Sequence, residues 1–333
     1  MNNNVFIIAE AGVNHNGSLD LAFKLCDAAK RAGADAVKFQ IFNPAKLVCK
    51  GTEKADYQKE NDKSSDNQFD MLSKLALSEN DFLQISEYCK KIDISFMATA
   101  FDEDSLMFLK NLGTNVIKVP SGEITNLPYL RKISELWNQI IMSTGMCSED
   151  EIIDAYNILC HNGANVTVLH CTTEYPAPFE TINLKYMNTI GNKLKVNYGY
   201  SDHTKGIEVP IAAVALGASV IEKHFTLDKS MDGPDHKASL NPEELSNMVS
   251  AIRNIEKALG NGNKVVNNIE ESNKKVIRKS IVAACHIKKG DIFTEQNLTC
   301  KRPGTGISPM LWDEVIGKQA TRNYDEDEMI ELW

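Results

Sequence analysis

Eight short apolar runs divide most of the chain, and a segment with helical periodicity follows most of them. The runs are residues 5–10, 36–40, 94–100, 116–121, 139–144, 166–172, 196–202 and 219–226. Their interiors are rich in Val, Ile and Phe and alternate little with polar residues, which is typical of parallel strands buried on both faces. Eight β/α repeats within about 250 residues predict a (β/α)8 TIM barrel. The competing fold is an open doubly wound sheet, but no GxGxxG motif follows the first run.

The segments between these runs carry the signals that begin and end helices. Ser18 is a candidate N-cap and Gly33 a candidate stop for the first helix. Asn241 and Gly260 bracket the last one, with Pro242 at its first position. We therefore predict helices over residues 18–31, 80–91, 103–111, 149–161 and 242–259.

Three segments depart from the repeat and define the domain organisation. Residues 41–67 form a long, polar, lysine-rich stretch, which is typical of a lid, a binding loop or a disordered segment. Residues 1–260 would form the catalytic barrel, and 261–276, rich in Asn, Lys and Glu, a linker. Residues 277–333 are expected to form a small β-rich unit, with strands near 278–284, 292–293, 298–303 and 316–322. A unit of about 55 residues is marginal alone, so we expect it to lean on the barrel or on a second subunit.

Composition narrows the class of protein. The chain has 333 residues, 43% hydrophobic and 24% charged, which is ordinary for a soluble enzyme. Its net charge of −9, without a dense basic tract, argues against nucleic acid or an anionic membrane as the main partner. No apolar run is long enough to cross a bilayer, and eight scattered cysteines contain no CxxC pair. We expect a cytoplasmic, reduced protein.

Polar residues gather at the C-terminal ends of the predicted strands. They are Glu10, Lys38, Gln40, Thr99, Lys118, Ser121, Ser143, Thr172, Ser201, Asp202, Glu222 and His224. Any one of them could be a capping or solvated residue, but twelve in register are hard to explain by chance. Barrel enzymes keep their active sites on that face, so the pattern predicts an active site there.

The last two predicted strands bring two imidazoles together. Glu222 and His224 share a face of their strand because successive side chains alternate, and His203 directly follows the neighbouring strand. Two histidines with carboxylates beside them predict a divalent-metal site with an acid–base group next to it. A hydrogen-bonded, half-buried histidine without a ligand would explain either imidazole alone better than it explains the cluster.

Two lysines lie at the ends of the second and fourth predicted strands. Lys38 and Lys118, with hydroxyl groups and a glycine-exposed backbone nearby, offer the charge and converging donors that a phosphate or phosphocarboxylate needs. A lysine that reaches out of a barrel mouth to solvent would explain one of them but not both. Together with the histidines, they predict a metal-dependent enzyme that acts on a small phosphorylated anion. A Lewis acid could polarise a carbonyl while Glu222 moves a proton or activates water.

Nine motifs occur in an order that resembles a known enzyme family. They are AEAGVNHNG (9–17), VKFQ (37–40), KVPSGE (118–123), STGM (143–146), HCTTEYP (170–176), SDHT (201–204), IEKHFT (221–226), GPD (233–235) and KRPG (301–304). This set resembles the nonulosonic (sialic) acid synthases without a missing block over residues 5–330. The C-terminal unit resembles their antifreeze-like (SAF) domain. The resemblance implies condensation of phosphoenolpyruvate with an open-chain N-acetylated amino-hexose to a nine-carbon 2-keto acid and phosphate.

The resemblance also implies roles for individual residues. Phosphoenolpyruvate would be held by Lys38, Thr99, Lys118, Ser121, Ser143 and Ser201. His203 and His224 would bind Mn²⁺ or Mg²⁺, which orients the sugar aldehyde for attack by the enol carbon. Water would then capture the oxocarbenium at C2, with Glu222 as its base, and phosphate would leave by C–O cleavage. The sugar would be contacted by Glu10, Gln40, Tyr175 and Asp235, and by Arg302 of the partner subunit's SAF domain, which implies a homodimer.

Two segments depart from the family pattern. Residues 98–101 read ATAF where the family usually has Ser-Thr-Pro-Phe, so Thr99 is kept but the following loop lacks its stiffening proline. Thr173 stands where some N-acetylneuraminate synthases have Asn, which changes one candidate contact to the sugar or the phosphate.

Four segments, 123–130, 172–179, 199–204 and 233–240, most resemble the bacterial legionaminic acid synthases. That subgroup implies 2,4-diacetamido-2,4,6-trideoxymannose as acceptor and a pocket that is roomy and apolar around C4 and C6. The alternatives within the family are N-acetylneuraminate synthase, which uses N-acetylmannosamine, and then pseudaminic acid synthase. A non-catalytic glycan- or ice-binding protein would not need the lysines, histidines and Glu222 together. Another metal-dependent barrel lyase or aldolase would not need Arg302.

Overall fold

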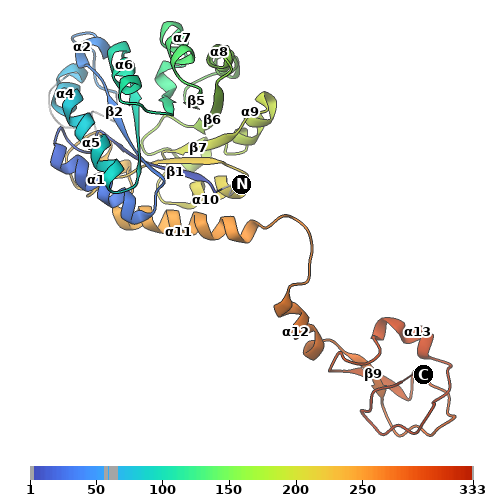
Figure 1. Cartoon of the computed structure of the whole chain (residues 1–333). Helices are drawn as coiled ribbons and strands as arrows, with labels where there is room; N and C mark the ends of the chain where they lie inside the picture. Colours follow the sequence, from blue (N-terminus) through green and yellow to red (C-terminus); the bar gives the residue numbers. More distant parts are fainter. Residues whose placement is uncertain (1–3, 56–58, 60–66, 332–333) are drawn as a thin grey trace. The chain divides into compact units, whose positions relative to one another are not determined.

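The computed structural model describes residues 4–55, 59 and 67–331. The chain divides into two compact units, Met1–Gly260 and Asn261–Trp333 (Figure 1). Of the predicted loop over 41–67, residues 56–58 and 60–66 lie outside the described part, so its interpretation as a lid stays a prediction. None of the helices that the described residues form has both the length and the apolar character needed to span a bilayer.

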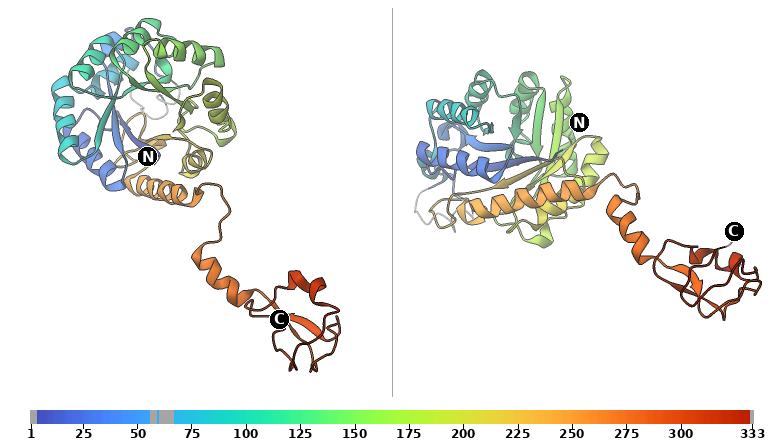
Figure 2. Two further views of the ribbon diagram at one scale, coloured as in Figure 1. Left: turned by 45° about the vertical axis from the view of Figure 1, so that its right-hand side comes forward. Right: turned by 60° about the horizontal axis from the view of Figure 1, so that its bottom comes forward.

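The first unit is a closed barrel of eight parallel strands in the order of the sequence, which confirms the predicted fold (Figures 1 and 2). The strands are β1 (Phe6–Gly12), β2 (Ala36–Ile41), β3 (Ser95–Ala100), β4 (Ile117–Val119), β5 (Gln139–Ser143), β6 (Asn165–Cys171), β7 (Tyr198–Asp202) and β8 (Val220–His224). The barrel closes between β1 and β8, where Glu10 pairs with His224 in register. Closure therefore places the first and the last strand of the barrel, with their polar end residues, side by side.

Helices encircle the strands in the left view of Figure 2. They are α1 (Leu19–Ala32), α5 (Glu79–Lys91), α6 (Glu103–Asn111), α7 (Leu127–Leu136), α8 (Glu149–Cys160), α9 (Tyr186–Leu194), α10 (Glu208–Ala215) and α11 (Pro242–Leu259). The predicted capping residues of the first and last helix are confirmed, although α1 begins and ends one residue later than predicted. The Ser18 side chain accepts a hydrogen bond from the Leu21 amide, and Gly33 ends α1 in the left-handed conformation. Asn241 forms a capping box with Glu244 at the start of α11.

An apolar layer fills the barrel interior beneath the polar strand ends. Its members are Ile8, Ala36, Met97, Ile141, Leu169 and Val220. On β1, β2, β3 and β8 this layer lies two residues before the polar side chains, and therefore on the same inward face. The interior is thus closed below, so that the space above the layer is a pocket and not a pore.

After β2 the chain leaves the simple repeat and forms two additional short helices. They are α2 (Pro44–Leu47) and α4 (Gln68–Leu75). With neighbouring side chains they form a separate apolar cluster around Val13, Phe42, Met71 and Leu75, with Leu47, Leu72 and Phe101 packed against it. This cluster belongs to the open end of the barrel, and it is distinct from the core between strands and helices.

The second unit contains α12 (Asn268–Ile277), β9 (Ser280–Ala283), β10 (Leu298–Lys301) and α13 (Trp312–Val315). β9 and β10 pair antiparallel. The strands predicted near 292–293 and 316–322 are reduced to one bridge, between Ile292 and Gln319. The predicted linker 261–276 contains most of α12, which begins with a capping box of Asn267 and Glu270 and has no buried residue. Its polar composition indicated a linker, and the capping box was the signal that indicates a helix.

Candidate active site

A cavity of about 400 Å³ opens at the C-terminal ends of the barrel strands. Every barrel residue with a predicted catalytic, substrate-binding or metal-binding role lines it, whereas Thr172 and Asp202, two of the twelve polar strand-end residues, do not. The predicted residues that line it are Glu10, Lys38, Gln40, Thr99, Lys118, Ser121, Ser143, Thr173, Tyr175, Ser201, His203, Glu222, His224 and Asp235. Arg302, the remaining predicted site residue, follows β10 in the second unit. The sequence therefore identified one contiguous polar surface from residues that lie as far as 225 positions apart (10 to 235).

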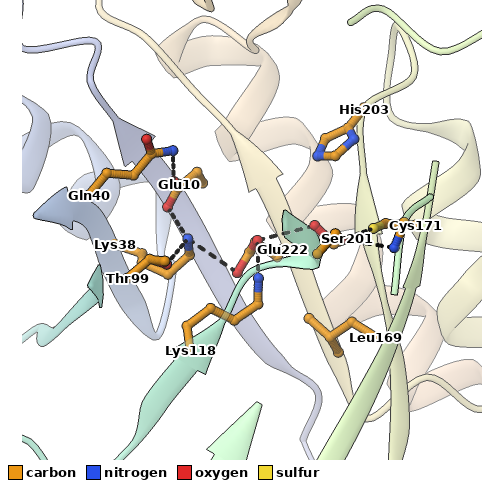
Figure 3. A network of polar contacts seen from close by, with 12 residues as sticks. Glu10, Lys38, Gln40, Thr99, Lys118, Leu169, Cys171, Ser201, His203 and Glu222 are labelled. Atoms are coloured by element: carbon orange, nitrogen blue, oxygen red, sulfur yellow. Dashed lines mark hydrogen bonds and ion pairs between the residues drawn. The ribbon is translucent and has the colours of Figure 1, made fainter. Parts of the chain in front are cut away.

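Two lysines and two carboxylates form a buried network at the centre of this surface (Figure 3). Lys118 Nζ lies 3.0 Å from Glu222 Oε1, and Lys38 Nζ lies 3.7 Å from Glu222 Oε2. On its other side Lys38 Nζ lies 2.7 Å from Glu10 Oε2. The four side chains are at most 5% exposed, and their formal charges sum to zero. The lysines predicted to capture an anion are thus already neutralised by carboxylates.

The network sets the protonation of its members. Burial alone would favour the neutral acid, but Lys118 and Lys38 lower the pKa of Glu222 to about 2, so this carboxylate is ionised. Burial opposes the charge on Lys38, yet Glu10 and Glu222 raise its pKa above the ordinary value. Burial lowers the pKa of Lys118, with repulsion from Lys38 adding to it and Glu222 opposing it. Of the two lysines, Lys118 is therefore the one that gives up its proton more readily.

Polar side chains from adjacent strands hold the network in place. Ser201 donates to Glu222 Oε1 at 3.1 Å, because β7 and β8 pair these two residues in register. Lys38 donates to Thr99 Oγ1 at 3.1 Å, across the β2–β3 pair. Gln40, on the same strand as Lys38, donates to Glu10 Oε1 at 3.1 Å and so holds the second carboxylate of the network.

A group of small hydroxyl and thiol side chains lies beside Lys118. The Gly145 amide donates to Ser121 Oγ at 2.8 Å. Gly145 has no side chain for a steric reason, because a Cβ there would lie 2.2 Å from Thr173 Oγ1 and 2.9 Å from Cys171 Sγ. Among the described residues, the buried hydroxyls of Ser143 and Thr173 have no hydrogen-bond partner. Buried hydroxyls in that state are available to donate to a ligand.

Two histidines and a tyrosine also line the cavity, next to the charged network. The ring centroids of His203 and His224 lie 5.5 Å apart, and the Tyr175 ring lies 4.1 Å from His203. Burial lowers the pKa of His203 to about 4, and burial together with repulsion from His203 lowers the pKa of His224 well below its ordinary value. Both imidazoles are therefore neutral at pH 7. Asp235 Oδ2 lies 3.7 Å from His224 Nδ1, and burial with repulsion from Glu10 raises the pKa of Asp235 to about 7.

With this geometry in view, comparison with known proteins identifies the family. Residues 25–264 match the NeuB family, and residues 278–331 match the SAF domain. The chain belongs to the NeuB family. The predicted resemblance to the sialic acid synthases, and the predicted barrel followed by an SAF domain, are both confirmed.

Individual relatives of this NeuB-family chain carry more specific names. An N,N'-diacetyllegionaminic acid synthase of Campylobacter jejuni is 53% identical over 97% of this chain and 98% of that protein. A protein of the same name from Legionella pneumophila is 47% identical over 96% of this chain and 91% of that protein. The crystal structure of an N-acetylneuraminic acid (sialic acid) synthetase from Leptospira borgpetersenii, in complex with citrate, matches with a TM-score of 0.73 and 35% identity. That match covers 81% of this chain and 90% of the other.

The histidine pair of this NeuB barrel fits a metal ion in its chemistry. His203 Nδ1 lies 2.6 Å from the Thr172 carbonyl, which accepts its proton and leaves the Nε2 lone pair for a ligand. His224 Nδ1 is buried and has no hydrogen-bond partner among the described residues. No group of three or more His, Cys, Asp or Glu side chains in the described residues is arranged to hold a metal. The pair would therefore hold an ion together with ligands from water or substrate.

Sequence reasoning missed the apolar side of the cavity. Its lining residues are Val13, Phe42, Leu47, Val48, Met71, Leu72, Leu75 and Phe101. The signal was present in α4, where residues 68, 71, 72 and 75 all line the cavity and follow the i, i+3, i+4, i+7 spacing of one helical face. The spacing indicates one apolar face of a helix, but it does not show that this face lines a cavity.

Proposed function

We propose that this NeuB-family chain is an N,N'-diacetyllegionaminic acid synthase. It would condense phosphoenolpyruvate with 2,4-diacetamido-2,4,6-trideoxymannose and release phosphate by C–O cleavage. The observation that carries the proposal is the ionised, buried Glu222 between two lysines and beside a histidine pair. The site lies in a chain that is 53% identical, over nearly its whole length, to a protein of that name.

The lysine side of the cavity suits phosphoenolpyruvate. Lys118 and Lys38 supply charge, while the hydroxyls of Ser121, Ser143 and Ser201 supply directed donors. The buried lysine–carboxylate network has no net formal charge, so a multiply charged anion needs further cations. A divalent ion at the histidines and Arg302 would supply them.

The reaction then follows from the positions of these groups. The electron pair of the C2–C3 double bond of phosphoenolpyruvate forms the new bond to the sugar aldehyde carbon, and the aldehyde oxygen takes a proton to become a hydroxyl. This leaves an oxocarbenium at C2. Water adds to C2 as Glu222 takes one of its protons. Breakage of the C2–O bond then releases phosphate, which takes the second proton from the new hydroxyl, and leaves a ketone at C2. The phosphate and carboxylate of the substrate compete with Glu222 for Lys118 and Lys38, which raises the basicity of Glu222 when it is needed.

The histidine side of the cavity suits the acceptor aldehyde. A divalent ion held there supplies Lewis-acid polarisation of the aldehyde oxygen when it is bound. The Thr172 carbonyl fixes the ring of His203, and Tyr175 packs against that ring, so both keep its Nε2 turned to the cavity. Asp235 and Glu10 border the same space and would accept hydrogen bonds from sugar hydroxyls.

The proposal includes a second subunit. Arg302 would come from the SAF domain of a partner chain and meet the acylamino group of the sugar, which makes the protein a homodimer. The cytoplasm is the proposed compartment, because all eight cysteines are free thiols and a reducing compartment keeps them so.

A panel of acceptors tests the proposal. Phosphate release from phosphoenolpyruvate is measured with Mn²⁺ and, in parallel, 2,4-diacetamido-2,4,6-trideoxymannose, N-acetylmannosamine and the acceptor of pseudaminic acid synthases. We expect the highest kcat/KM with the diacetamido-trideoxymannose. Faster turnover of N-acetylmannosamine would show a neuraminate synthase instead, and no release with any N-acylated sugar would refute the synthase activity.

A further inference from the structure

The cavity has two chemically different sides. One side carries the charged network and the histidines, and the other is built by the excursion between β2 and β3. There α4 turns one continuous face into the cavity, beginning with Gln68 and continuing through Met71, Leu72 and Leu75. Leu47 of α2 and Val48 after it complete the surface. We call Leu47, Val48 and Leu72 the α2–α4 wall.

The side chains of the α2–α4 wall are not apolar because they pack in the barrel core. Met71 and Leu75 are buried at 3% and 8% exposure, and they pack with Val13 and Phe42 in a cluster separate from the main core. Leu47, Val48 and Leu72 lie on the cavity side of that cluster and are only half-buried. When an apolar group of a ligand covers apolar side chains in an open cavity, their surface is removed from water, and this makes the free energy of binding more favourable.

The substrates proposed above differ in what they can place against such a wall. Phosphoenolpyruvate brings a phosphate and a carboxylate, which belong with Lys38 and Lys118. The acceptor brings an aldehyde, which belongs with His203 and His224, and hydroxyls, which belong with Glu10. The apolar groups of the acceptor are its C6 methyl and the methyls of its two acetyl groups, and of these only the C6 methyl stands at the end of the carbon chain opposite the aldehyde.

We propose that the α2–α4 wall binds the C6 methyl of the acceptor and makes the enzyme select 6-deoxy sugars. This inference rests on the proposed function and deepens it. A 6-hydroxymethyl group at the same place would put a hydroxyl against Leu47, Val48 and Leu72, where it loses water without gaining a partner. The wall thus discriminates by excluding a hydroxyl as well as by fitting a methyl.

The test compares two acceptors that differ only at C6. They are 2,4-diacetamido-2,4,6-trideoxymannose and its 6-hydroxylated counterpart, 2,4-diacetamido-2,4-dideoxymannose. The readout is the ratio of their kcat/KM values in one preparation, which does not depend on how much of a variant is folded. For the wild-type enzyme we expect the 6-deoxy sugar to be favoured by about tenfold or more, the usual scale for one methyl group in an apolar pocket.

Replacing single leucines of the α2–α4 wall should weaken the preference for the 6-deoxy sugar. In Leu72→Asn and, separately, Leu47→Asn we expect the ratio to fall at least about fivefold, because the amide can pair with the 6-hydroxyl. The matched control is Leu83→Asn, the same change at a leucine of α5 that is 42% exposed and lies outside the cavity lining, and its ratio should stay at the wild-type value.

The outcomes separate the inference from the function. If wild-type enzyme turns over both sugars at equal kcat/KM, or if neither wall variant changes the ratio, the wall does not select at C6 and the inference is wrong while the synthase activity stands. If wild-type enzyme uses neither sugar, the proposed function itself fails.

Discussion

At the scale of single residues, Glu222 has to be ionised in a place where burial disfavours charge. Lys118 at 3.0 Å and Lys38 at 3.7 Å offset that penalty and hold the carboxylate ready. The sequence predicted Glu222, Lys38 and Lys118 as site residues, but it predicted lysines free to capture an anion. Their pairing depends on β1, β2, β4 and β8 surrounding one interior, and that proximity exists only in the closed barrel.

The first prediction concerns the base. Glu222→Gln keeps the shape of the side chain but removes the charge that accepts a proton from water. We expect kcat to fall by about 10²–10⁴-fold, the usual contribution of a positioned general base. Phosphoenolpyruvate binding, measured by calorimetry, should be retained or tighter, because Lys118 loses its competing carboxylate.

The control for this change is Glu87→Gln, at an exposed glutamate of α5 outside the cavity lining. It should behave as wild type. If Glu222→Gln turned over substrate at the wild-type rate, Glu222 would not be the general base.

The second prediction concerns stability in acid. Burial, partly opposed by Asp81, lowers the pKa of His15 to about 4 from an ordinary 6.5. The unfolded chain therefore binds more protons between these values, so the stabilising effect is complete above pH 6.5 and is lost as pH falls toward 4. For a histidine that is 1% exposed, the loss is on the order of 2–3 kcal/mol.

Denaturant unfolding at pH 7 and pH 4.5 measures this effect. In His15→Asn the decrease in unfolding free energy between the two pH values should be smaller than in wild type. An equal decrease in the two proteins would show that His15 is not the group that titrates.

At the scale of elements, β7 and β8 are joined on their outer face by a buried ion pair. Lys223 donates to Asp202, and both side chains are at most 1% exposed. Asp202 also accepts hydrogen bonds at 3.0 Å from the amide and the hydroxyl of Thr204. Because side chains alternate along a strand, fixing Lys223 outward fixes Glu222 and His224 inward.

The third prediction tests this pair. Lys223→Met leaves the Asp202 carboxylate buried without its cation, and we expect a loss of about 3–5 kcal/mol in unfolding free energy. The double variant Lys223→Met, Asp202→Asn should recover part of that loss, since the uncompensated charge is gone. Additive losses in the double-mutant cycle would contradict the coupling.

Elements also show where sequence reasoning succeeds and where it ends. The barrel strands and the caps of α1 and α11 could be predicted because each depends on local pattern, such as Ser18 before a helix and Gly33 after it. The sequence could not show that the apolar face of α4 lines the cavity. An apolar helical face has the same residue spacing whether it covers a core or lines a cavity. Similarly, α12 has a polar sequence without a buried residue, and only its capping box indicates a helix.

At the scale of the whole molecule, the chain consists of a catalytic barrel and an SAF unit with its own small core around Phe293 and Tyr324. The cavity described above is formed by residues of the barrel unit, and Arg302 belongs to the SAF unit. The proposed completion of the site by the SAF unit of a partner chain requires two copies.

The fourth prediction uses this division. Arg302→Ala and Glu222→Gln are each expected to have little activity, but mixing and re-equilibrating the two should restore roughly a quarter of wild-type activity. The reason is that half of the dimers then contain one barrel with Glu222 next to an intact Arg302 from the partner. The absence of any recovery would contradict a site shared between subunits.

The central claim is that the enzyme condenses phosphoenolpyruvate with the acceptor by C–O cleavage. The most direct test follows the bridging oxygen of phosphoenolpyruvate into the products. Phosphoenolpyruvate labelled with ¹⁸O in its C–O–P bridge is incubated with Mn²⁺ and 2,4-diacetamido-2,4,6-trideoxymannose, and ³¹P NMR records the phosphate produced. The account predicts acceptor-dependent release of phosphate that carries the label, because the C–O bond breaks, at the same rate as the nine-carbon acid forms. Unlabelled phosphate, or release that does not depend on the sugar, would contradict it.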